Sequence, residues 1–68
     1  MLRLRVKEVM EAKGLTMTRL SRLADVNYKT IVGIVRDPYR EVEYKTLYKI
    51  AKALGVEVGE LIEEVGEE

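Results

Sequence analysis

The 68-residue sequence contains no cysteine, histidine, tryptophan or phenylalanine, and it has a single proline. Without cysteine no disulfide can form, and without cysteine and histidine the usual zinc ligands are missing. Nucleophilic catalysis of the Ser/His or Cys/His kind is excluded for the same reason. No Gly-rich phosphate loop is present, and the adjacent carboxylates Glu63 and Glu64 would splay apart on a helix. We therefore expect no enzymatic activity and neither a metal nor a cofactor site.

Long apolar runs are also missing. No stretch approaches the roughly 20 apolar residues that a membrane helix needs, and residues 1–5 are too short and too charged for a signal peptide. With 47% hydrophobic and 35% charged residues, the composition is typical of a folded chain. We expect one small domain over residues 1–68, soluble and cytoplasmic, without membrane contact.

An excess of one charge is absent as well, but the charges are unevenly distributed. All 12 lysines and arginines lie between Arg3 and Lys52, together with six acidic residues. The other six acids lie from Glu57 onward. A basic body is suited to an anionic partner. The acidic end has two interpretations: it serves solubility, or it repels DNA from the far face or docks on a basic surface of a partner.

Helical spacing and stop signals predict an all-α, compact five-helix bundle. Gly14 and Gly55 end two of the helices, and Pro38 ends another. The predicted helices span about 4–13, 17–24, 28–36, 44–54 and 58–64, before an acidic tail at 65–68. One alternative stays open, because residues 2–6 also alternate with period two and could form an extended arm.

Residues 16–37 predict two short helices joined by a tight turn. Thr16 and Asn27 are good N-caps, since their side-chain oxygens accept hydrogen bonds from free amides at a helix start. Asp25 stands where the backbone must reverse, and it tolerates a positive φ better than most residues do. The second and third helices therefore form a candidate helix-turn-helix.

The cap, turn and apolar residues in and around this helix pair resemble those of a known family. They comprise Gly14-Leu15-Thr16, Leu20-Ser21, Val26, Ile31, Ile34, the run from Leu47 to Val56, and Leu61-Ile62. With these residues the chain resembles the Cro/repressor-type helix-turn-helix family, which is lambda-repressor-like and includes the xenobiotic response element group. The resemblance implies a repressor-type, sequence-specific regulator of transcription that binds double-stranded DNA as a homodimer, with no small-molecule effector evident.

The chain departs from the family pattern at several positions. Met17 replaces a glutamine that touches phosphate, and Asp25 replaces a glycine. Met10 and Val35 together replace an ion pair, so we predict that they touch, because exchanging both charged partners for packed apolar residues is often neutral. Gly33 replaces a polar residue that reaches a base. It permits close approach either to DNA or to another part of the protein.

In the resembled family the third helix enters the major groove with its N-terminal residues leading. Lysine donates to guanine O6 and N7, and an apolar side chain packs on the thymine methyl. The candidate base contacts are Tyr28, Lys29, Thr30, Val32 and Gly33. The candidate phosphate contacts are Thr16, Asn27, Arg36, Arg40 and Lys45.

Apolar residues near the C-terminus exceed what so small a core needs, and they are the candidate dimer interface: Val56, Val58, Leu61 and Ile62. The alternative is that they only close the bundle. A second function also stays open, because the zero net charge, Met17 and Gly33 fit an antitoxin-like or adapter module that binds protein with weak or no base readout. A continuous positive face around the third helix would favour DNA.

Overall fold

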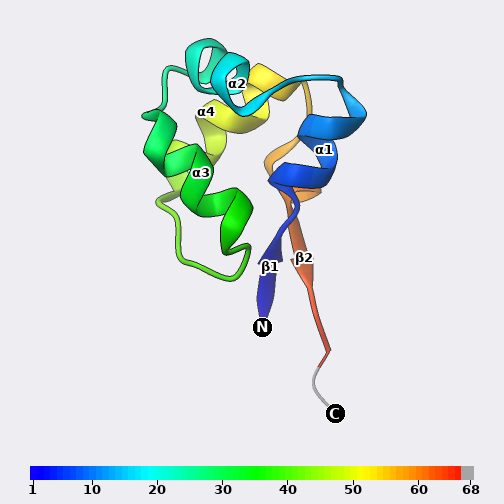
Figure 1. Ribbon diagram of the computed structural model, residues 1–68. Coiled ribbons are helices and arrows are strands. Elements are labelled where there is room, and N and C mark those ends of the chain that lie inside the picture. Colours follow the sequence, from blue (N-terminus) through cyan, green and yellow to red (C-terminus); the bar gives the residue numbers. More distant parts are fainter. Residues whose placement is uncertain (67–68) are drawn as a thin grey trace.

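In the computed structural model, which describes residues 1–66, four α-helices pack beside a two-stranded sheet (Figure 1). The elements in chain order are β1 (Leu2–Leu4), α1 (Val6–Ala12), α2 (Met17–Ala24), α3 (Tyr28–Arg36), α4 (Tyr44–Leu54), the 3-10 helix η1 (Val58–Leu61) and β2 (Ile62–Glu64). The bounds predicted for α2, α3 and α4 are confirmed. Glu67 and Glu68, the end of the predicted acidic tail, lie outside the described residues.

The prediction of five helices is wrong at both ends of the chain. The first helix begins at Val6 instead of residue 4, because residues 2–4 form a strand. This strand agrees with the alternative prediction of an extended arm. The predicted helix at 58–64 is a single 3-10 turn followed by β2. A helix of this length is marginal in water, and the segment contains Gly59 and β-branched residues. Pairing with β1 satisfies its backbone groups instead.

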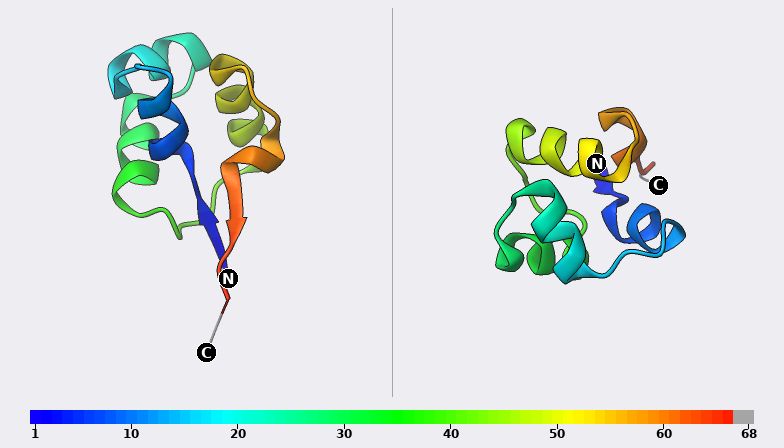
Figure 2. Two further views of the ribbon diagram at one scale, coloured as in Figure 1. Left: turned by 90° about the vertical axis from the view of Figure 1, so that its right-hand side faces the viewer. Right: turned by 90° about the horizontal axis from the view of Figure 1, so that it is seen from above.

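Strands β1 and β2 run antiparallel and bring the two ends of the chain side by side (Figure 2). Leu4 pairs with Ile62 and Leu2 with Glu64. Beyond the strands, the Val65 amide donates to the Met1 carbonyl at 2.8 Å. Leu4 is buried, whereas Leu2, two residues earlier on the same face of the strand, is exposed. Residue 65, which was predicted to belong to the acidic tail, therefore extends the pairing.

The helices enclose one apolar core. Helix α2 packs against both α3 and α4, and α1 also contacts these two helices. The largest fully buried side chains come from five elements, with two of them from α3: Val6, Leu20, Ile31, Ile34, Ile50 and Leu61. Burying a leucine or isoleucine contributes about 1.5–3 kcal/mol. This cluster sets the orientation of every helix.

Met10 and Val35 both face this core. Met10 is 5% exposed, and Val35 is partly buried and packs against the same cluster. Because α1 contacts α3, the two positions lie on facing helices. Their direct contact stays a prediction.

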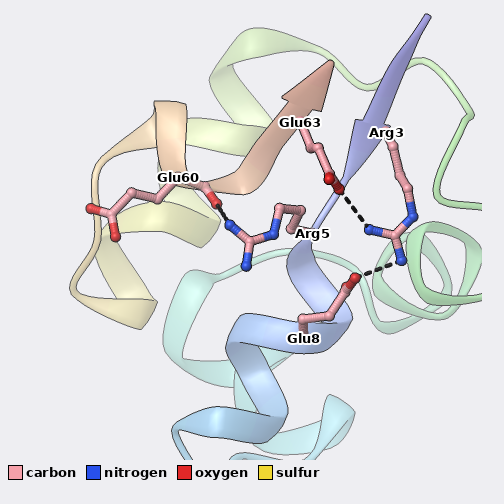
Figure 3. A network of polar contacts seen from close by, with 5 residues as sticks. All are labelled: Arg3, Arg5, Glu8, Glu60 and Glu63. Carbon is pink, nitrogen blue, oxygen red and sulfur yellow. Dashed lines mark hydrogen bonds and ion pairs between the residues drawn. The ribbon is translucent and has the colours of Figure 1, made fainter. Parts of the chain in front are cut away.

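A polar network joins the sheet to α1 (Figure 3). The Arg3 guanidinium forms salt bridges with Glu8 on α1 and with Glu63 on β2, the latter at 3.2 Å. Arg5 donates to the Glu60 carbonyl at 3.5 Å. Partial burial raises the pKa of the Glu8 carboxyl, but hydrogen bonds from its own backbone and from Arg3 outweigh this effect, and the pKa of Glu8 is lowered. Part of the acidic C-terminal segment is thus docked on the chain's own basic N-terminus.

The turn between α2 and α3 depends on Asp25, which adopts a left-handed conformation with φ 58° and ψ 47°. The Val26 amide donates to the Ser21 carbonyl at 3.0 Å and the Asp25 amide to the Arg22 carbonyl at 3.3 Å. These two bonds form a Schellman cap, a motif that usually has glycine in the left-handed position. The expected positive φ at Asp25 is confirmed.

Replacing Asp25 by glycine should raise the free energy of unfolding by about 0.5–1 kcal/mol. The left-handed conformation costs an ordinary L-residue about 1–2 kcal/mol, and the extra freedom of glycine in the unfolded chain offsets part of that gain. Chemical denaturation of Asp25→Gly and Asp25→Ala measures the effect. The alanine variant should be less stable than the parent. Equal stability of the three proteins would show that the turn carries no strain.

Glu8→Gln should remove a pH-dependent part of the stability. Because the folded-state pKa of Glu8 is lowered, ionised Glu8 stabilises the fold above the ordinary carboxyl value of 4.5, and this contribution is lost as the pH falls through the lowered pKa. The stability difference between parent and variant should therefore shrink below about pH 4.5. Glu11→Gln, on the exposed side of the same helix, is the matched control. A difference independent of pH would contradict the role of the Arg3 contact.

Candidate nucleic-acid interface

Helices α2 and α3 are capped as predicted. The Thr16 hydroxyl oxygen accepts from the Arg19 amide at 3.1 Å, and the Asn27 side-chain oxygen accepts from the Lys29 amide at 2.8 Å. Each cap uses an acceptor only. The hydroxyl proton of Thr16 and the side-chain amide of Asn27 remain available as donors, and both residues are exposed. These two helix starts can therefore offer hydrogen-bond donors to an anion.

The inner side of α3 determines which residues lie outside. Ile31 and Ile34 are buried, at 0% and 1% exposure. Since successive residues of an α-helix are rotated by about 100°, the side opposite to these isoleucines is formed by Lys29, Gly33 and Arg36. We call these three residues the outer face of α3.

The predicted base contacts are not all placed equally on this helix. Lys29 is exposed in the middle of the outer face, and Tyr28, 46% exposed, lies on the flank of the helix about 100° around from it. Val32 lies at one edge and Thr30 at the other, and both are partly buried. Lys29 and Gly33 are thus brought together on the outer face, whereas Thr30 is turned toward the flank.

Gly33 is covered by a side chain from the loop that follows α3. A Cβ atom at Gly33 would overlap Nη1 of Arg40 and would lie 3.1 Å from its Cζ. The close approach that glycine permits is therefore made by Arg40, and the atoms nearest to that Cβ position all belong to this side chain.

The predicted phosphate contacts lie on several elements. Arg36 is exposed in the last turn of α3, and Lys45 is exposed in the first turn of α4. Thr16 lines a surface hollow together with residues of α2, namely Thr18, Arg19, Arg22 and Leu23. Both salt bridges among residues 1–66 involve Arg3, so no carboxylate in this part of the chain is within salt-bridge distance of Lys29, Arg36 or Arg40.

The four residues predicted as a dimer interface do not form one surface. Leu61 is 0% exposed inside the chain's own core, so it offers no surface to a second copy, and its side chain closes the bundle. Val56 and Val58 line one hollow beside α4. Ile62 lines a different one, beside β1.

Sequence reasoning overlooked two tyrosines that border the hollow of Val56 and Val58. Tyr44 and Tyr48 are 70% and 47% exposed, and the Lys52 ammonium nitrogen lies 5.8 Å from the centroid of the Tyr48 ring. Their spacing of four residues, along one flank of the apolar stripe of α4, was a usable signal.

Comparison of the sequence with protein-family models agrees with the capped helix pair described above. A family model described as Cro/C1-type HTH DNA-binding domain matches residues 5–67 of the chain. A search among curated proteins returned no match. Over residues 1–66, none of the helices has the length and apolar character needed to span a membrane.

Proposed function

The chain belongs to the family of Cro/C1-type HTH DNA-binding domains, and we propose that it is a transcriptional regulator that binds duplex DNA sequence-specifically through the outer face of α3. The observation that carries this proposal is the chemistry of that face. Lys29 and Arg36 are exposed there, opposite Ile31 and Ile34, and no carboxylate among residues 1–66 forms a salt bridge with them. Exposed, unneutralised cations attract a phosphate backbone.

In the proposed complex α3 lies in the major groove with its N-terminal turn leading. The Lys29 ammonium donates to guanine O6 or N7, and Tyr28 packs against a thymine methyl. Val32 contributes an apolar edge to the same groove. Thr30, on the flank, donates to a groove wall or a base edge. Base preference is thus concentrated in the first turn of the helix.

Phosphate contacts position the helix without reading sequence. The donors left free by the Thr16 and Asn27 caps supply two of them at the starts of α2 and α3. Arg36 and Lys45 supply two more. The hollow next to Thr16, lined also by Arg19 and Arg22, supports a phosphate at the start of α2.

We propose further that two copies bind a palindromic site, with half-sites separated by one helical turn of about 34 Å. The contact surface combines Val56 and Val58 with the exposed rings of Tyr44 and Tyr48. Aromatic residues at the centre of an interface contribute much of its binding energy. Leu61 is left out of this surface because it is buried within the chain.

The protein-binding alternative receives less support. An adapter or antitoxin-like module would present an apolar surface around α3, but the outer face holds the cations Lys29 and Arg36, and among the residues of α3 only Tyr28 is a large exposed apolar group. The cytoplasmic location expected from the sequence stays a prediction.

Binding to duplex DNA should fall steeply with salt, and Lys29 and Arg36 should affect it differently. Arg36→Ala should weaken binding to all sequences alike and reduce the slope of log affinity against log salt by about one, because one phosphate contact is lost. Lys29→Ala should cost about 1–3 kcal/mol on the preferred sequence only. Fluorescence anisotropy with labelled duplex, from low to moderate salt, measures both quantities.

Lys7→Ala is the matched control for this series. It removes one exposed positive charge from α1, a helix outside the pair formed by α2 and α3. Its affinity and salt slope should equal those of the parent protein. The absence of any salt-sensitive binding by the parent protein would refute a DNA-binding function.

Tyr44→Ala should weaken self-association at least about fivefold, since an interface residue of this kind contributes more than about 1 kcal/mol. The ring is 70% exposed, so the fold should be unaffected. Sedimentation equilibrium without DNA measures the association constant. Tyr39→Ala removes another exposed tyrosine, from the loop after α3, and should leave association unchanged. If both variants associate like the parent, the dimer surface lies elsewhere.

A further inference from the structure

We propose that Arg40 is a base-reading residue: its guanidinium takes the place of the side chain that Gly33 lacks and enters the major groove with α3 to bind guanine. This inference rests on the proposed function, since it presumes that the outer face of α3 meets DNA. It differs from the phosphate contact expected of Arg40 from the sequence.

The position of the guanidinium carries the proposal. Nη1 of Arg40 overlaps the point where a Cβ of residue 33 would stand, with Cζ at 3.1 Å and Cδ at 3.9 Å from that point. Gly33 is four residues after Lys29 and three before Arg36, so its outer side lies between these two cations. The guanidinium therefore lies on the outer face of α3, beside the row formed by Lys29 and Arg36 and between them along the helix axis.

The loop after α3 is built to hold Arg40 there. The Asp37 amide donates to the Gly33 carbonyl at 2.9 Å, which continues the helical bonding by one residue. The Arg40 amide donates to the Asp37 carbonyl at 3.2 Å, and the Tyr39 amide donates to Asp37 Oδ1 at 3.2 Å. These bonds close a turn from Asp37 to Arg40, with proline at its second position and aspartate at its first, as such turns favour. The turn reverses the chain and directs Arg40 back over α3.

The sheet anchors the same turn from the other side. The Leu4 amide in β1 donates to the Pro38 carbonyl at 2.7 Å. Leu4 is itself buried and paired with Ile62 of β2. The backbone that carries Arg40 is thus fixed both to α3 and to β1, which limits the conformational freedom that DNA binding would have to remove.

The Arg40 guanidinium can supply a fork of hydrogen-bond donors to the outer face of α3, whose own residues offer such a fork only at Arg36 in the last turn. Arginine presents its donors in a planar fork that matches guanine O6 and N7, the commonest specific contact in the major groove. Residues 28–36 include no glutamine or asparagine, and their one arginine, Arg36, is in the last turn. No carboxylate among residues 1–66 is within salt-bridge distance of Arg40 to compete for the fork.

Gly33 is required for this arrangement but not for the fold. Any larger residue at position 33 would meet the far end of a flexible side chain, which can swing away without moving the backbone. Within a helix alanine is intrinsically favoured over glycine. Gly33→Ala should therefore raise the melting temperature while displacing the guanidinium from the outer face.

In vitro selection from duplex DNA with a randomised central segment tests the proposal. The parent protein should enrich a guanine at one position of each half-site. Arg40→Ala should lose the preference at that position alone, with affinity for the guanine-containing site reduced about 10–100-fold, while the preferences read by Lys29 persist. Gly33→Ala should reproduce this loss, and the double variant should show no further loss. Arg36→Ala, as a matched control, should weaken all sites equally.

Two results would overturn the proposal. If Arg40→Ala weakens every sequence alike and lowers the salt slope by about one, Arg40 contacts phosphate instead. If Gly33→Ala binds with unchanged preference, the guanidinium does not act from the outer face of α3. Failure of the proposed function itself has a different signature, because the parent protein would then retain no DNA at low salt, before any variant is compared.

Discussion

The burial of Ile31 and Ile34 is the interaction on which the rest of this structure depends. With these two side chains at 0% and 1% exposure, the rotation of α3 about its axis is fixed, and Lys29 must face outward. The helix has little intrinsic stability, since it contains glycine and β-branched residues. Its conformation is maintained by α2, whose Leu20 is equally buried and whose end is locked by the left-handed Asp25. The polar surface of α3 is therefore rigid because its apolar surface is packed.

The sheet contributes to the same surface from a distance. By pairing residues 2–4 with residues 62–64, it closes the core beside Leu61 and places the Leu4 amide against the Pro38 carbonyl. That bond fixes the turn which carries Arg40. Salt bridges from Arg3 to Glu8 and Glu63 connect the sheet to α1. Through Glu63 they also hold part of the acidic C-terminal segment against the basic N-terminus. Within residues 1–66 the acidic and basic parts of the chain thus have separate tasks, with the neutralised pairs at the sheet and cations without a salt bridge on α3.

Local signals predicted the central three helices to the residue, because their caps and stops act within one turn: Asn27 begins α3, and Gly55 ends α4. The C-terminal strand was not predictable in this way. Its partner lies 60 residues away, and residues 58–64 carry a period that fits a helix as well as a strand. The location of Arg40 over Gly33 depends on a turn closed by tertiary bonds, so the sequence showed only that Gly33 permits some close approach. Tyr44 and Tyr48 were detectable from their spacing and were overlooked.

Amide chemical-shift mapping by NMR tests the central claim most directly, namely that the outer face of α3 and the capped helix starts meet DNA. The ¹⁵N-labelled chain is titrated at low salt with duplex DNA of random sequence. The account predicts that the largest shifts occur at residues 16–18, at residues 27–33 and at Arg40, and that they vanish as salt is raised. Shifts confined to α4 and β2, or no shifts at any salt concentration, would contradict it.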